Sequence, residues 1–267
     1  TDLLPVEPRA PWFGVTSESR TVAAHRLEPL FIMADTFHNI IAGEATAAAS
    51  GTTFNDLNPA DRTDIIGTFP ASGPADVDRA VEAAREAFSS WSATPAPERG
   101  NILRQIGDAL TERKTELARI MTREMGKPVF ETKGDVQEAI DTAYYAASET
   151  RRLFGHTVPS ELPDKFNMSI RRPVGVCGVI TAWNFPVAVP TWKIFPAIAS
   201  GNAVVFKPSE EAPHSATVLC EIMSDAGVPD GVVNLIHGAG EAGKALVEHP
   251  DVDAIGFTGS SETGKAI

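Results

Sequence analysis

The sequence predicts an α/β fold centred on a doubly wound, mostly parallel, Rossmann-like sheet. Two apolar, β-branched runs, residues 174–181 and 203–206, are long enough for strands buried on both faces, as parallel sheets require. From residue 174 onwards, strand patterns alternate with helix patterns. This alternation indicates parallel strands that are joined by right-handed crossover helices.

The composition excludes several classes of protein. The 267 residues can bury a sizeable core and form one or two domains, and a hydrophobic fraction of 43% is ordinary for a globular protein. The sequence contains 23 Lys and Arg residues and 35 Asp and Glu residues, so the net charge is -12. We therefore expect neither nucleic acid nor an anionic membrane as a partner.

Two cysteines, Cys177 in an apolar strand and Cys220 in a predicted helix, make neither a disulfide framework nor a metal site. We expect no bound metal and a reducing, cytoplasmic setting. The most apolar region, 174–206, contains three prolines and Lys193, which a membrane-spanning helix would not carry together. The N-terminus also lacks the pattern of a secretory signal, so we expect no membrane span and no export.

Residues 1–36 are predicted to be a disordered N-terminal extension, because they carry scattered prolines and no sustained hydrophobic period. Met33 stands just before the first organised sequence. Two hypotheses remain open: either residues 1–32 are upstream sequence and Met33 is the true start, or they are an ordinary flexible extension.

Residues 37–155 are predicted to be mainly helical. A strand and turn at 39–43 and a hairpin of 54–58 with 65–69 come first. Apolar residues spaced by three and four then predict a helix from about 74 to 91, a second helical region from 97 to about 125, and a third helix from about 133 to 154.

Residues 156–172 break this helical pattern with two prolines and then alternate through Phe166, Met168 and Ile170. The alternation predicts a strand-like excursion that pairs with another segment or another subunit. Beyond it, the strands of the sheet are predicted at 174–181, 203–206, 232–236 and 254–257, with helices at about 212–226 and 241–248 and another starting after residue 260.

Polar residues follow the first two strands of this sheet. Asn184 comes after the first strand, and Lys207, Ser209 and Glu210 come at the end of the second. The carboxyl ends of parallel strands meet at the edge where open α/β sheets bind ligands. The Asn184 amide could either cap the local backbone or donate to a developing oxyanion.

Lys207 and Glu210 also allow two interpretations. They could form a simple ion pair at the surface. They could instead hold the two hydroxyls of a ribose, with a carboxylate that would repel a 2′-phosphate.

Two glycine-containing turns follow later strands. Residues 238–243, Gly-Ala-Gly-Glu-Ala-Gly, satisfy the dinucleotide-binding glycine pattern, but they follow the third strand of the sheet, so a tight turn is as good an explanation. In residues 257–264, Ser260 precedes a helix. It could cap that helix, or the helix start could receive a phosphate.

Three stretches together resemble the cofactor domain of the aldehyde dehydrogenase superfamily in order and spacing. They are Thr181-Ala182-Trp183-Asn184-Phe185-Pro186, residues 201–210 and Gly256-Phe257-Thr258-Gly259-Ser260, and the resemblance runs from about 37 to 267. It implies that Asn184 donates its amide to the substrate oxygen and that Lys207 and Glu210 hold the adenine ribose. It further implies a cofactor site made with Thr181, Trp183, Gly240, Phe257, Gly259, Ser260 and Thr263, to which we add Ser209 at the same rim.

The resemblance also implies an organisation. Residues 37–155 would be the N-terminal helical part of the cofactor domain, 156–172 an oligomerisation arm and 173–267 a truncated NAD-binding core. Glu210 favours NAD over NADP. The full-length protein would be a homodimer or homotetramer that acts on a small-molecule aldehyde.

The family's general base, in a Glu-Leu-Gly-Gly motif, and its nucleophilic cysteine do not occur in these residues, and Cys177 and Cys220 are poor substitutes. We therefore expect the N-terminal fragment of an NAD-dependent aldehyde dehydrogenase without its catalytic domain, inactive by itself. One alternative is a non-catalytic nucleotide-binding or assembly protein. Another is an acyl-phosphate reductase using NADPH, against which Glu210 argues.

Overall fold

The computed structural model describes residues 35–267. The hypotheses about residues 1–34, including Met33 as a start, lie outside the described residues. Residues 35 and 36, the last two of the predicted extension, form strand β1 (Asp35–Thr36), which pairs in parallel with Gly67 and Thr68.

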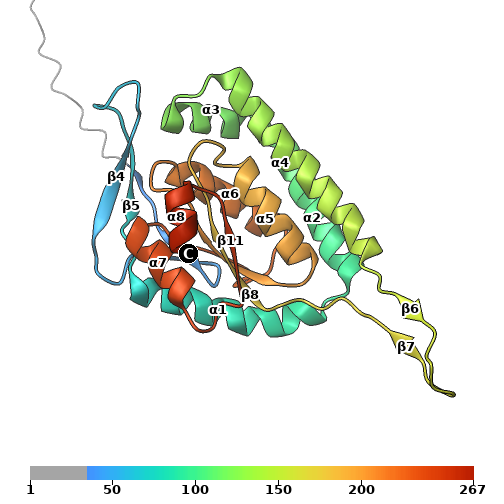
Figure 1. The fold of residues 1–267 in the computed structure, drawn as a ribbon. Coiled ribbons are helices and arrows are strands. Elements are labelled where there is room, and N and C mark those ends of the chain that lie inside the picture. The colour runs from blue at the N-terminus through green and yellow to red at the C-terminus, as the bar shows by residue number, and fades with distance from the viewer. Residues whose placement is uncertain (1–34) are drawn as a thin grey trace, which may run out of the picture. The chain divides into compact units, whose positions relative to one another are not determined.

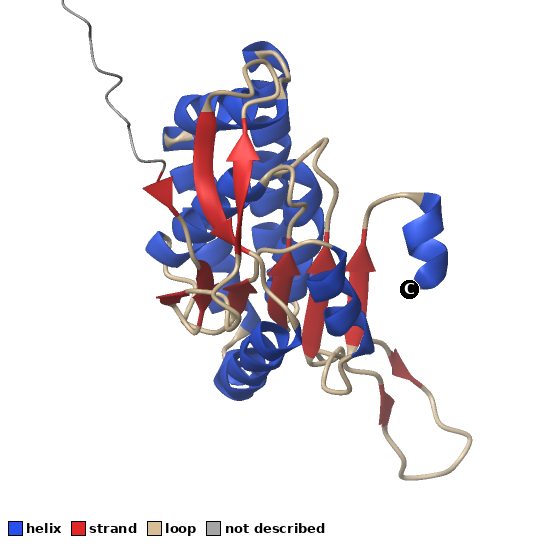
Figure 2. Cartoon of the chain, turned by 90° about the vertical axis from the view of Figure 1, so that its left-hand side faces the viewer, coloured by secondary structure: helices blue, strands red, loops and turns tan. Residues whose placement is uncertain are grey.

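A six-stranded sheet forms the centre, in the order β11-β8-β9-β10-β2-β3. Figure 2 shows strands in red and helices in blue. Strands β8 (Val176–Ile180), β9 (Ala203–Lys207), β10 (Val233–Leu235) and β11 (Ala254–Phe257) run parallel. Strands β2 (Asn39–Ile41) and β3 (Glu44–Thr46) add an antiparallel edge. The predicted α/β class with a mostly parallel sheet is confirmed.

Both faces of the sheet are covered, which explains the continuous apolar runs. In β9, Ala203 and Val205 pack in the core with helix α1 (Pro74–Ala93) and helix α7 (Gly240–Glu248). The alternate residues Val204 and Phe206 pack in the opposite core. That second core includes helices α2 (Ala96–Glu112), α3 (Lys114–Met125), α4 (Val129–Glu149), α5 (Ala188–Ala199) and α6 (Pro213–Asp225).

Two helical boundaries differ from the sequence prediction. The region expected from 97 to 125 is two helices, because the backbone leaves helical geometry at Arg113 (φ -93°, ψ 8°). The third helix begins at Val129, directly after Pro128, and ends at Glu149 before a short 3₁₀ turn, η1 (Thr150–Arg152). The first turn of α4 exposes Val129 and Phe130, so the hydrophobic period does not reveal it.

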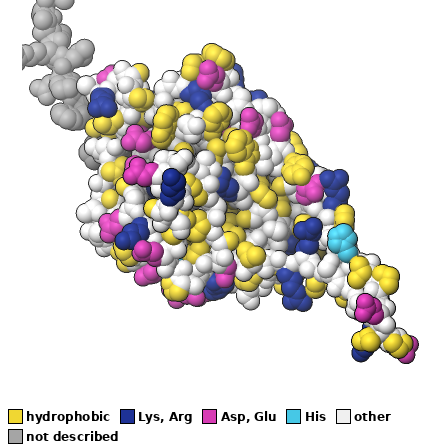
Figure 3. Space-filling view, in the orientation of Figure 1, with side chains coloured by type: hydrophobic (Ala, Val, Ile, Leu, Met, Phe, Trp, Pro, Cys, Tyr) yellow, Lys and Arg dark blue, Asp and Glu magenta, His cyan; other side chains and the backbone are white. Residues whose placement is uncertain are grey.

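The predicted hairpin is present as β4 (Thr53–Leu57) and β5 (Ile65–Pro70). Residues 156–172 contain the short antiparallel pair β6 (Thr157–Val158) and β7 (Asn167–Met168), which projects from the body of the chain (Figure 1). We call this projecting segment, residues 156–172, the ribbon. Its hydrophobic side chains are exposed, Phe166 to 73%, and yellow atoms mark hydrophobic side chains along it in Figure 3.

Helix α8 (Ser261–Ala266) is the last element. Within residues 35–267, the helices are all too short or too polar to span a bilayer. The same residues contain no cluster of His, Cys, Asp and Glu side chains that could hold a metal ion.

Candidate functional site

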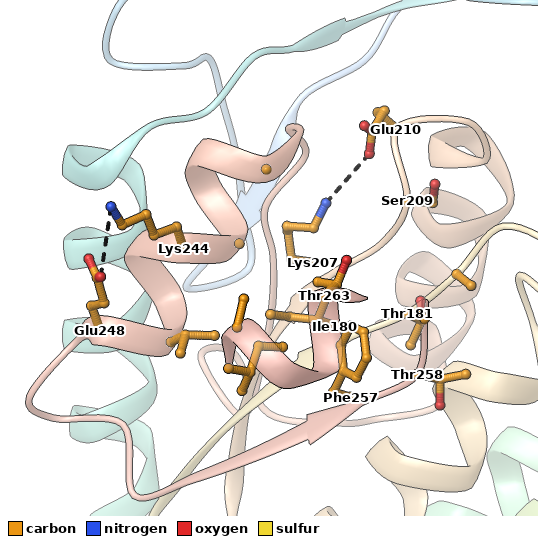
Figure 4. Close-up of a pocket in the computed structure, with 17 residues that line it drawn as sticks. Ile180, Thr181, Lys207, Ser209, Glu210, Lys244, Glu248, Phe257, Thr258 and Thr263 are labelled. Atoms are coloured by element: carbon orange, nitrogen blue, oxygen red, sulfur yellow. Dashed lines mark ion pairs between the residues drawn. The ribbon is translucent and has the colours of Figure 1, made fainter. Parts of the chain in front are cut away.

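A cavity of about 490 Å³ lies at the carboxyl ends of β8, β9 and β11, against helices α7 and α8 (Figure 4). This is the edge at which the sequence predicts a ligand site. All of the predicted cofactor residues except Trp183 and Ser260 line it: Thr181, Lys207, Ser209, Glu210, Gly240, Phe257, Gly259 and Thr263. Their roles toward a cofactor stay predictions.

Lys207 is the last residue of β9 and is only 5% exposed. Its Nζ atom donates a hydrogen bond of 2.7 Å to the Gly238 carbonyl and lies 3.8 Å from the Glu210 carboxylate. Burial lowers the pKa of Lys207, and Glu210 opposes that shift. The ammonium is thus held in place at the wall of the cavity, whereas the Glu210 side chain remains 43% exposed and open to a ligand.

The glycine pattern 238–243 contains a tight turn and also borders the cavity. Gly238 has φ +146°, and a Cβ atom there would lie 3.1 Å from Ser72 O and from Ala242 Cβ, so this glycine makes a close turn. Gly240 opens helix α7 and lines the cavity, as Gly243 does. A Cβ atom on Gly243 would lie 3.6 Å from Lys207 Cδ, which places α7 directly against the Lys207 stem.

Ser260 is the N-cap of α8, because its Oγ accepts a hydrogen bond of 3.1 Å from the Thr263 amide. Ser260 therefore caps the helix, which is one of the two roles that the sequence allowed for it. The neighbouring residues Gly259 and Thr263 face the cavity, but Ser260 is not among its lining residues.

Trp183, Asn184 and Phe185 form an exposed loop between β8 and α5. The backbone carbonyl of Asn184 accepts a hydrogen bond of 2.7 Å from Lys127 Nζ. Within residues 35–267, no hydrogen bond engages the Asn184 side-chain amide, so the backbone-capping interpretation does not describe it. Asn184 lies outside the lining of the cavity.

A second hollow of about 650 Å³ shares Glu210 with the first and is lined by Trp183 and by a buried pair of carboxyl groups. Burial raises the pKa of Asp56 to about 7 and that of Glu124 to about 8. The charge of Asp56 adds to the rise at Glu124, whereas the Glu124 side chain opposes the rise at Asp56. Glu124 also accepts a hydrogen bond of 3.0 Å from the Ser215 amide, at the start of α6. Sequence periodicity did not reveal this pair, since its members lie 68 residues apart, at positions 56 and 124.

Neither cysteine lies in surroundings that would activate its thiol. Cys220 is buried on α6 and Cys177 lies on β8. Burial raises the pKa of both thiols, which keeps them protonated and poorly nucleophilic.

Other residues of the site were also missed by sequence reasoning. Lys244, Val247 and Glu248 of α7 line the cavity, and Lys244 pairs with Glu248 on its rim (Figure 4). Lys127 and Asp135 hold the Asn184 loop from α4 and the turn before it. No local sequence pattern distinguishes these residues from other charged residues on helices, because their place in the site depends on elements that lie far apart in the chain.

Comparison with known proteins agrees with this geometry. Residues 46–267 match the family described as the aldehyde dehydrogenase family. An alpha-ketoglutaric semialdehyde dehydrogenase from Bacillus subtilis is 42% identical over 87% of this chain and 48% of its own length. The chain thus spans about half the length of the curated relatives that it matches.

Solved structures are similar as well. An NAD-dependent aldehyde dehydrogenase from Sinorhizobium meliloti superimposes with a TM-score of 0.84 at 37% identity, covering 87% of this chain and 47% of the other. An NADP dependent enzyme from E. coli gives a TM-score of 0.84 at 39% identity, with 87% and 48% covered.

Proposed function

The chain belongs to the aldehyde dehydrogenase family, and we propose that it is the N-terminal, cofactor-binding part of an NAD-dependent enzyme that oxidises an aldehyde to a carboxylic acid. The observation that carries this proposal is the cavity at the carboxyl ends of β8, β9 and β11, with Lys207 and Glu210 on one wall. The match to about half of each relative supports a fragment of a longer enzyme.

The residues of the cavity fit an adenine dinucleotide. The buried Lys207 ammonium has donors to offer to a ribose hydroxyl, and Glu210 presents two carboxylate oxygens that can accept hydrogen bonds from a vicinal diol. A Cβ atom on Gly240 would meet no protein atom within 4 Å, so the backbone there can approach a ligand closely. When bound, NAD supplies the acceptor for the hydride that leaves the substrate carbon.

Glu210 supports NAD rather than NADP. A 2′-phosphate at this ribose would place a dianion beside the exposed carboxylate. Because the similar structures are named for both cofactors, one NAD-dependent and one NADP dependent, the proposed preference for NAD rests on Glu210 alone.

Asn184 is proposed to stabilise the oxyanion in the complete enzyme. The family's cysteine thiolate, from the part beyond these residues, would attack the aldehyde carbon and turn the carbonyl oxygen into an oxyanion. The free amide of Asn184 would donate to that oxygen, while the family's glutamate would activate the water that releases the acid. Removing an oxyanion donor costs about 10²- to 10³-fold in kcat.

A semialdehyde that carries a carboxylate is the first substrate class to assay, because the Bacillus subtilis relative is named for such a substrate. We also propose that the full-length enzyme is cytoplasmic and assembles as a homodimer or homotetramer, with 156–172 as the arm. The exposed apolar side chains of that ribbon support this assembly.

The test uses the full-length protein encoded by the gene that contains this chain. NADH formation at 340 nm is followed with a panel of aldehydes, and NAD binding by the 267-residue chain is measured by calorimetry. We expect turnover by the full-length protein and NAD binding without turnover by the chain. A full-length protein that binds NAD but oxidises none of the aldehydes would favour a non-catalytic role, and reduction of acyl phosphates with NADPH would favour the reductase alternative.

A further inference from the structure

Lys127 makes three separate contacts, two with the Asn184 loop and one with Asp135 of α4. Its Nζ atom donates a 2.7 Å hydrogen bond to the Asn184 carbonyl and lies 3.6 Å from the centroid of the Phe185 ring. The same atom lies 3.9 Å from Asp135 Oδ2. Only 14% of the lysine side chain is exposed, so water competes little for these contacts.

The backbone that carries Lys127 is itself fixed on both sides. Gly126 ends α3 in the left-handed conformation with φ +78°, and Pro128 precedes the first residue of α4. These two residues leave the short connection little freedom. The position of the Lys127 backbone is therefore fixed by the end of α3 and the start of α4.

Asp135 extends the same support to the other end of the loop. Its Oδ1 atom accepts a 2.7 Å hydrogen bond from the Ala188 amide, at the first residue of α5, while Oδ2 faces Lys127. Asp135 is buried and in the described residues Oδ2 has no hydrogen-bond partner, so Lys127 is the cation that compensates it. Burial raises the pKa of Asp135 to about 6, and Lys127 opposes the shift.

We propose that Lys127 is a positioning residue for Asn184, which it holds through the Asn184 carbonyl, the Phe185 ring and the Asp135 carboxylate. This inference rests on the proposed function, because it gives a purpose to a fixed Asn184. An oxyanion donor works only when its N–H is aimed in advance, and a misplacement of about 1 Å can cost about 10²-fold in rate. Among residues 35–267, one other hydrogen bond engages the loop of Trp183, Asn184 and Phe185, from the Val189 amide to the Phe185 carbonyl.

The mutational test uses the full-length enzyme with Lys127→Met, which keeps the length of the side chain and removes its charge. Lys133→Met is the matched control, since Lys133 is an exposed residue of α4 with no hydrogen bond or ion pair within residues 35–267. We expect kcat to fall about 10- to 100-fold in Lys127→Met. The KM for NAD should stay within about twofold, because Lys127 does not line the cofactor cavity.

Two further variants separate positioning from general damage. Lys127→Arg keeps the charge and should restore part of kcat. In an Asn184→Ala background, Lys127→Met should lower kcat no further, because a residue that acts through Asn184 has nothing left to position. An unchanged kcat in Lys127→Met, or the same fold-loss with and without Asn184, overturns the inference.

Hydrogen exchange on the 267-residue chain gives a readout that does not need turnover. Lys127→Met should speed exchange of the Ala188 and Val189 amides, which donate to Asp135 Oδ1 and to the Phe185 carbonyl, about tenfold or more. Lys133→Met should leave this exchange unchanged. Failure of the wild-type enzyme to oxidise aldehydes would refute the proposed function alone, and exchange would then decide whether Lys127 holds the loop. Equal exchange in both variants and the wild type overturns the inference.

Discussion

His237 makes stability depend on pH in a direction that can be calculated. It follows β10 and is fully buried, with its Nε2 atom 3.1 Å from Thr217 Oγ1. Because Thr217 Oγ1 donates its own proton to the Pro213 carbonyl, it accepts from the histidine ring, which fits a neutral ring protonated at Nε2. Burial, together with the nearby charge of Lys207, lowers the pKa of His237 from 6.5 to about 3.

The sign follows from proton linkage. The unfolded chain binds a proton at His237 near pH 6.5, and the folded chain does so only near pH 3. Stability from this residue is therefore fully present above pH 6.5 and is lost as the pH falls toward 3. At pH 5 the loss is 1.5 pH units at 1.36 kcal/mol each, or about 2 kcal/mol.

Urea unfolding of the 267-residue chain at pH 7.5 and pH 5.0 measures this loss. The test compares wild type, His237→Gln and the control His156→Gln, because the His156 side chain is exposed on the ribbon. The raised pKa values of Asp56 and Glu124 work in the opposite direction, since folded carboxyl groups take up protons first as the pH falls. Their contribution is common to all three proteins and cancels in the comparison.

We expect wild type and His156→Gln to lose about 2 kcal/mol more between these pH values than His237→Gln does. If all three proteins respond equally to pH, His237 is not a buried neutral group and the reasoning is refuted.

Three further predictions concern the cofactor, the core and the arm. Glu210→Ala in the full-length enzyme should raise the ratio of kcat/KM for NADP over NAD about tenfold or more by removing the charge beside the ribose site, and an unchanged ratio would contradict that role. Trp91→Phe should lower the free energy of unfolding by about 2 kcal/mol, because the buried indole donates a 3.1 Å hydrogen bond to the Ile198 carbonyl. Urea unfolding measures this loss, and a loss below about 0.5 kcal/mol would count against that hydrogen bond. Phe166→Asp should shift the full-length protein toward smaller species in analytical ultracentrifugation, because Phe166 is 73% exposed on the ribbon, and an unchanged distribution would exclude the arm from the interface.

Two mistaken helix boundaries lack a local signal in the sequence. Arg113 is an ordinary helix residue in a sequence without Gly or Pro beside it, so nothing local predicts the break between α2 and α3. Val129 and Phe130 are apolar but exposed, which hides the first turn of α4 from a periodicity argument.

By itself, the sequence determined the parallel strands and the edge at which they end, because burial on both faces demands continuous apolar runs and polar residues mark their ends. The positions of Lys207, Glu210 and Gly240 at that edge followed from these local signals. Only the tertiary structure decided that Asn39 joins the sheet beside β10, that Lys127 reaches the Asn184 carbonyl and that His237 is sealed against Thr217. These contacts join residues between 20 and 198 positions apart, and no pattern within a window of the sequence carries such information.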